Sequence, residues 1–114
     1  MLSLRHGTRV FISTEPTDMR KGFDGLSAIV EHGWGTSPLS GDLFVFSNRR
    51  QTLLKLLYWD TDGFAIWHKR LERGTFRIPR PTTEGRIELT AAKLAMILEG
   101  IDIQNTRKRK RYRR

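Results

Sequence analysis

The stretch from residue 53 to residue 71 restricts the fold more than any other part of the chain. Two segments rich in aliphatic and aromatic residues, 53–59 and 64–71, flank the sequence Asp60-Thr61-Asp62-Gly63. A short polar connection that contains glycine, placed between two such segments, is typical of a β-hairpin. The chain is therefore expected to contain a sheet built around this hairpin.

The hairpin predicts a register, and the register divides its side chains between two faces. If Trp59 pairs with Phe64, then Lys55 lies opposite His68 on the same face, and Arg70 lies further along it. The other face carries mostly core residues. Like charges opposite each other cost stability, so the first face is either a solvated cationic surface or a site where an anion binds. A slip of one residue would exchange the two faces.

The rest of the chain adds short strands and two helices. Apolar runs bounded by turn residues predict strands at 8–12, 43–46, 75–78 and 86–89. Helical spacing predicts one helix from Asp18, as its N-cap, to about His32, and a second from the cap Thr90 to a stop at Gly100. The fold class is α+β: a single domain, residues 1–103, in which a mostly antiparallel sheet carries two packed helices.

Positive charge is concentrated at the C-terminus. The net charge is +9, and seven of the 21 Lys and Arg residues lie between 107 and 114, where no acidic residue occurs. Such a segment is expected to be disordered when free, so we assign residues 104–114 to a basic tail. A run of this kind binds polyanions, of which nucleic acid is the usual one in a cytoplasm; the alternative is a solubilising end without a partner.

Several classes of function are disfavoured by what the sequence lacks. There is no Cys, which excludes disulfides, thiolate metal sites and thiol nucleophiles, and the three His residues are far apart. Asp18 and Asp24 would lie on different faces of a helix, which disfavours a shared magnesium site. No phosphate-loop, dinucleotide or serine-hydrolase motif is present, so we expect no enzyme, metal or cofactor. Without a membrane-spanning run or a signal peptide, the expected location is cytoplasmic.

The segment DMRKGFDGL, residues 18–26, is dense in charge and glycine. Asp18 suits a helix N-terminus, but Arg20 and Lys21 in the first turn oppose the helix dipole at a cost of about 0.3–1 kcal/mol each. Gly22 and Gly25 each weaken a helix by about 1 kcal/mol relative to Ala. Two interpretations remain open: an anion binds at this helix start, or the cations are simply exposed and the glycines allow close packing on the sheet.

Three segments together resemble the accessory protein TnpB of the insertion-sequence-66 family of bacterial transposable elements. They are TDMRKGFDGL (17–26), GDLFVFSNRRQTLLKLLYWDTDGFAIWHKRLERGTF (41–76) and LTAAKLAMILEGID (89–102). The resemblance extends from about Gly7 to Asp102 and implies a small protein, encoded beside a separate transposase, that assists transposition and has no catalytic residues. It is distinct from the RNA-guided nuclease also called TnpB, which is far longer and has an acidic site. The strongly basic tail goes beyond the family pattern.

The combined expectation is a non-catalytic accessory protein for DNA transposition that binds DNA and assists the transposase. The candidate DNA contacts are Arg20, Lys21, Arg49, Arg50, Lys55, Arg70, Arg107, Lys108, Arg109, Lys110, Arg111, Arg113 and Arg114. Contacts of this kind, to phosphates, confer little sequence specificity. The alternative is a protein–protein adaptor that docks on the transposase through the hairpin residues Trp59, Phe64 and Trp67 and contacts DNA little. The oligomeric state is left open.

Overall fold

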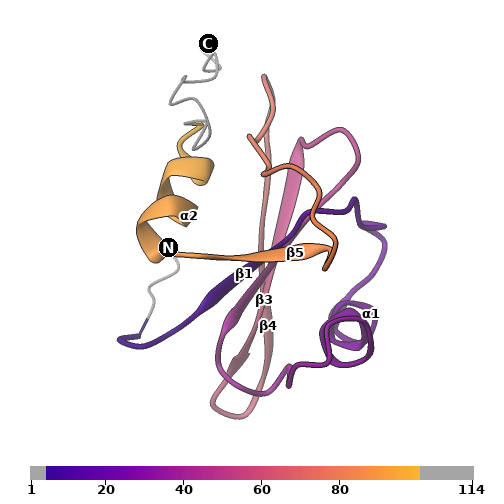
Figure 1. Cartoon of the computed structure of the whole chain (residues 1–114), viewed down its shortest axis with the longest axis vertical. Coiled ribbons are helices and arrows are strands. Elements are labelled where there is room, and N and C mark those ends of the chain that lie inside the picture. Colours follow the sequence, from indigo (N-terminus) through magenta and orange to yellow (C-terminus); the bar gives the residue numbers. More distant parts are fainter. Residues whose placement is uncertain (1–4, 101–114) are drawn as a thin grey trace.

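A five-stranded sheet forms the centre of the protein in a computed structural model that describes residues 5–100 (Figure 1). The strands lie in the order β4-β3-β2-β1-β5, and of these only the central pair β1 and β2 is parallel. Their bounds are Val10–Ser13 for β1, Leu43–Ser47 for β2, Leu53–Asp60 for β3, Gly63–Arg70 for β4 and Arg86–Leu89 for β5. The predicted α+β domain with a mostly antiparallel sheet is confirmed.

Two helices cover opposite faces of this sheet (Figure 1). Helix α1 (Phe23–Ala28) continues into a π-helical turn, Ile29–Gly33, and follows β1 as the crossover to the parallel strand β2. Helix α2 (Ala91–Leu98) follows β5. The α1 core contains Leu26, Val30, Phe44, Phe46 and Leu57. The α2 core contains Val10, Ile12, Leu43, Val45, Leu54, Leu56, Phe76, Leu89, Leu94 and Ile97. Both faces are therefore apolar, which explains why β2 is buried along its whole length.

The hairpin has the register that the sequence predicts. Trp59 pairs with Phe64, and Lys55 pairs with His68. The Trp59 and Phe64 rings meet edge to face, with centroids 5.1 Å apart. Thr61 occupies the left-handed region at φ +59°. Because Asp60 pairs with Gly63, only Thr61 and Asp62 form the turn, as the Asp-Thr-Asp-Gly sequence implies. The left-handed conformation of Thr61 is unfavourable for a β-branched residue.

The second helix also has the ends that its sequence predicts. Thr90 is the N-cap, and its Oγ1 accepts a hydrogen bond from the backbone N–H of Lys93 at 3.1 Å. Gly100 adopts φ +84°, the left-handed conformation that ends a helix. Here local chemistry alone sets the boundaries.

The strand expected at 75–78 does not form. Phe76 lies in this segment, is fully buried in the α2 core, and donates its backbone N–H to Gln51 O at 2.7 Å. The segment runs between Gly74, at φ +77°, and the buried Pro79, which has no N–H for a ladder. The short apolar segment that suggested a strand reflects one aromatic side chain inserted into the core. The first strand also begins at Val10, two residues later than expected.

The predicted basic tail, residues 104–114, lies outside the described residues. Its candidate DNA contacts lie there with it: Arg107, Lys108, Arg109, Lys110, Arg111, Arg113 and Arg114.

Candidate nucleic-acid interface

The candidate cations within residues 5–100 fall into three groups, of which the first lies at one end of the sheet. Arg49 and Arg50 are in the turn between β2 and β3, and Arg70 ends β4 opposite Leu53, the first residue of β3. The antiparallel pairing of β3 and β4 thus brings residues about 20 positions apart in sequence to the same end of the sheet. All three side chains are exposed.

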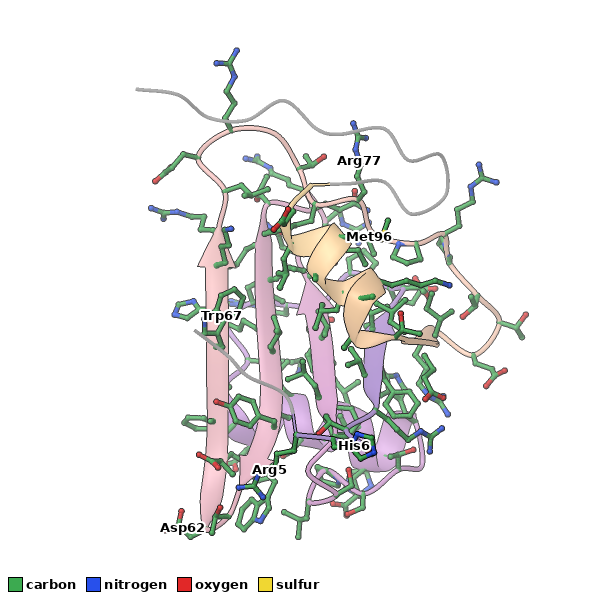
Figure 2. The ribbon with its side chains drawn as sticks, turned by 90° about the vertical axis from the view of Figure 1, so that its left-hand side faces the viewer. Arg5, His6, Asp62, Trp67, Arg77 and Met96 are labelled. Atoms are coloured by element: carbon green, nitrogen blue, oxygen red, sulfur yellow. The ribbon has the colours of Figure 1, made fainter. Side chains whose placement is uncertain are left out.

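The loop after β4 adds cations that the sequence analysis did not select. Two backbone hydrogen bonds hold this loop against the turn between β2 and β3: Leu71 N to Thr52 O at 2.8 Å, and Phe76 N to Gln51 O at 2.7 Å. We define the basic end by its seven cations, which are Arg49, Arg50, Lys69, Arg70, Arg73, Arg77 and Arg80. Figure 2 shows Arg77 at this end and Asp62, in the hairpin turn, at the opposite end. The repeated arginines in RLERGTFRIPR, residues 70–80, were the signal for the missed ones.

Little negative charge offsets the basic end. Within 49–50 and 69–80 the only acidic residue is Glu72, which lies 3.8 Å from Arg70 with both side chains largely exposed. Exposed pairs of this kind contribute about 0–1 kcal/mol, so Arg70 remains available to another anion. The far end of the sheet carries Asp42, Asp60 and Asp62. Glu15, Asp18 and Glu84 follow β1 or precede β5, so they lie at the same end of the sheet as Arg49 and Arg50, around a separate cleft.

The turn that carries Arg49 and Arg50 is fixed by its own hydrogen bonds. Asn48 Oδ1 accepts from the backbone N–H groups of Thr52 and Leu53 at 2.9 and 3.0 Å. Its Nδ2 donates to Thr52 Oγ1 at 3.0 Å. A rigid turn holds the two exposed arginines next to each other, which lowers the conformational entropy lost when they bind a ligand.

The second group, Arg20 and Lys21, lies in the DMRKGFDGL segment. Arg20 binds Asp18 with two parallel bonds, Nε to Oδ1 at 3.1 Å and Nη2 to Oδ2 at 2.8 Å. Asp18 Oδ1 also accepts the backbone N–H of Arg20 at 2.9 Å. The hydrogen bonds from Arg20 lower the pKa of Asp18 from its usual 3.8 to about 2.

The prediction that Asp18 caps the first helix is wrong. The helix begins at Phe23 with Gly22 as its N-cap, and no side chain caps it. Asp18 instead stabilises a turn, closed by Lys21 N to Asp18 O at 3.1 Å. An Asp that binds nearby backbone competes with helix formation. Because Arg20 and Lys21 precede the helix, they are not in its first turn, and this explains how the sequence tolerates them.

The glycines of this segment do not approach the sheet closely. A Cβ at Gly25 would lie 3.0 Å from Cβ and Cγ of Lys21, and a Cβ at Gly22 would have nothing within 4 Å. Gly25 therefore makes room for the stem of Lys21. Nothing in the structure explains why residue 22 is glycine.

The third group is Lys55 alone, and its ammonium binds the protein itself. Nζ donates to Met19 O at 2.7 Å and to Lys21 O at 3.0 Å. A lysine on β3 thus holds the turn before α1 onto the sheet. The face that carries Lys55 was expected to be a solvated cationic surface or an anion site. Instead its apolar part lies under α1, and two carbonyl oxygens accept hydrogen bonds from the ammonium of Lys55, so no anion is needed to explain this lysine.

The DMRKGFDGL segment borders a shallow cleft of about 280 Å³. Lys21 and Trp34 line it together with the carboxylates of Glu15, Asp18 and Glu84. Among residues 5–100, no three His, Asp or Glu side chains are grouped as a metal site would require. The charge of this cleft is mixed, whereas the basic end is almost wholly positive.

Residues 8–108 match the family described as IS66 Orf2 like protein. The chain belongs to this family. Two relatives come from Sinorhizobium fredii (strain NBRC 101917 / NGR234), both described as uncharacterized proteins. The one called y4hO is 41% identical and y4jC is 33% identical, each over 102 residues, which cover 90% of this chain and 88% and 86% of theirs. No solved structure matches the chain significantly.

Membership in the IS66 Orf2-like family confirms the resemblance found in the three sequence segments and implies involvement in the transposition of IS66 elements. The family is not a known catalytic one. In the part of this IS66 Orf2-like protein that the structure describes, no helix is long and apolar enough to cross a membrane.

Proposed function

We propose that this IS66 Orf2-like protein is a non-catalytic accessory factor that binds DNA through its basic end and so assists the transposase of its element. The observation that supports this most is the convergence of seven exposed cations, with one carboxylate among them, from two segments distant in sequence. Clustered Arg and Lys on one surface are the electrostatic footprint of a nucleic-acid partner.

The basic tail fits the same proposal. Helix α2 follows β5, whose last residue lies beside the start of β1, and runs from there toward the basic end (Figure 2). The described chain stops at Gly100, and the first tail cation, Arg107, is seven residues further along the sequence. The tail and the basic end would therefore contact neighbouring phosphates of one duplex.

The salt dependence of such binding reports the number of phosphate contacts. Log affinity for duplex DNA falls against log salt with a slope of about −0.9 for each phosphate neutralised. If the seven cations of the basic end all contact phosphates, the slope from them alone is about −6. Because phosphates carry no base identity, affinity should vary little with sequence.

The test is a fluorescence-anisotropy titration of the full chain with a short duplex across a range of salt concentrations. The double variant Arg49→Gln/Arg50→Gln should reduce the size of the slope by about 2. The matched control Arg5→Gln/Lys93→Gln loses the same charge from exposed residues outside the basic end and should change the slope much less. Equal losses in both variants, or no binding by the unaltered chain, would contradict the proposal.

The alternative function, an adaptor that docks through the hairpin aromatic residues, has less support. Phe64 packs against the α1 core and Trp67 against the α2 core, so they lie on opposite faces of the sheet. They do not form one continuous patch. Co-purification with the transposase after nuclease treatment separates the two functions: a complex that survives favours the adaptor, and one that is lost favours a DNA bridge.

A further inference from the structure

Strand β4 is a long, unpaired edge of the sheet. It has eight residues and pairs only with β3 on its inner side; within residues 5–100 no strand lies on its outer side. Figure 2 shows it as the outermost strand, away from α2. The other edge, β5, has only four residues, with Arg86 and Glu88 among them. Of the two edges, β4 offers many more backbone groups to a further strand.

The middle of β4 lacks the features that usually protect an edge. It contains no proline, and its central residues Phe64, Ala65, Ile66 and Trp67 are all apolar and half-buried. Charge occurs only near its ends: Asp62 lies just before the strand, and Lys69 and Arg70 close it. Protected edges are typically short, carry charged side chains such as Lys, or are interrupted by proline or inward-pointing charge, and β4 has such charge only in its last two residues. This edge is therefore suited to pairing.

The order of charges along β4 selects the direction and register of a partner. A second copy running antiparallel, with Ile66 opposite Ile66, brings Asp62 of each copy beside Arg70 of the other. In this register Phe64 lies opposite His68, and the large Trp67 lies opposite the small Ala65, each pair on a common face. A register shifted by two residues in one direction would place Asp62 beside Glu72, and like charges there are unfavourable. The opposite shift would place Asp60 beside Arg70, but it would leave the Asp62–Arg70 pairs unmade.

We propose that two copies of this chain associate through antiparallel pairing of their β4 strands, which joins their sheets into one. The contact is isologous, so each Asp62–Arg70 pair occurs twice. The pairing leaves Arg49, Arg50, Arg73, Arg77 and Arg80 outside the interface, and it places the two basic ends at opposite ends of the joined sheet. Arg70 belongs both to this interface and to the basic end. The DNA test varies Arg49 and Arg50, however, and the dimer test is made without DNA, so either proposal can fail alone.

Sedimentation equilibrium of the full chain, without DNA, tests this association. The mass should approach twice the chain mass of 13.3 kDa as concentration rises. Arg70→Glu, or Asp62→Arg, should raise the dimer dissociation constant about tenfold because two attractive contacts become repulsive. The double variant Asp62→Arg/Arg70→Glu should restore association because it exchanges the two charges.

Arg73→Glu is the matched control, since Arg73 is exposed at the same end of the sheet but lies outside β4. It should leave the dissociation constant unchanged. Backbone amides of β4 should also exchange hydrogen more slowly at high protein concentration than at low. A monomer at every concentration would overturn the proposal. So would a dimer that both single charge reversals leave intact, because its interface would then lie elsewhere.

Discussion

The DMRKGFDGL segment and the basic end both carry exposed cations, but the protein uses them differently. In the segment, Arg20 binds Asp18 with two parallel hydrogen bonds, and the carbonyl oxygens of Met19 and Lys21 bind Lys55. At the basic end Glu72, the one acidic residue within 49–50 and 69–80, lies 3.8 Å from Arg70. The two regions already differ in net charge, since DMRKGFDGL holds two acidic and two basic residues whereas residues 69–80 hold one acidic and five basic residues. The spatial partners add that the cations of the first region are part of a structural turn, while those of the second form a candidate binding surface.

The largest effect is expected from removing the side chain of Phe76, which holds the arginine-rich loop in place. Phe76→Ala should reduce the free energy of unfolding by about 3–5 kcal/mol because it leaves a cavity in the α2 core. Urea unfolding followed by circular dichroism measures this loss. The milder Phe76→Leu should keep the fold while it loosens the loop, and its DNA affinity should fall without a change of charge. Unaltered affinity in that variant would mean that the loop cations do not act together.

A smaller effect is expected when the lysine that holds the DMRKGFDGL segment is replaced. Lys55→Met should cost about 1–3 kcal/mol of unfolding free energy because two carbonyl oxygens lose a charged donor. Lys69→Met, on the neighbouring strand, is the matched control and should change stability little, since Lys69 is exposed. Similar losses in both variants would show that the segment does not need its link to β3.

DNA binding gives a direct comparison of the two regions. The double variants Arg20→Gln/Lys21→Gln and Arg49→Gln/Arg50→Gln remove the same charge. The second should reduce the size of the salt slope by about 2, and the first should reduce it by less. The physical reason is that Asp18 already neutralises Arg20. The same anisotropy titration measures both. A larger loss from the first variant would move the binding surface to the DMRKGFDGL segment.

The smallest expected effect concerns pH. The pKa of Asp18 is lower in the folded chain, about 2, than its usual 3.8, so its ion pair stabilises the fold above about pH 4 and loses that contribution as pH falls through 2. Arg20→Ala should return the pKa of Asp18 toward its usual value and weaken this pH dependence. A titration of the Asp18 carboxyl by NMR checks the shift. An unchanged pKa in the variant would assign its cause to another group.

Local patterns predicted those parts of the fold in which local chemistry decides the structure. The register of the hairpin followed from its turn and its alternation, and the ends of α2 followed from Thr90 and Gly100. Asp18 and Phe76 show where such patterns fail. Asp18 suits both a cap and a turn, and the choice depends on Arg20. Phe76 lies in a short apolar segment that suits a strand, but the segment forms a loop whose aromatic side chain packs in the core.

The sequence by itself therefore determined the fold class, the hairpin register, the caps of the second helix and the family. The tertiary structure decided which cations remain free and which are occupied. The reason is distance along the chain: Lys55 binds carbonyl oxygens 36 and 34 residues away, and the loop after β4 reaches the turn before β3 through two backbone hydrogen bonds. Charge is a property of each residue, but its availability depends on neighbours that only folding brings together.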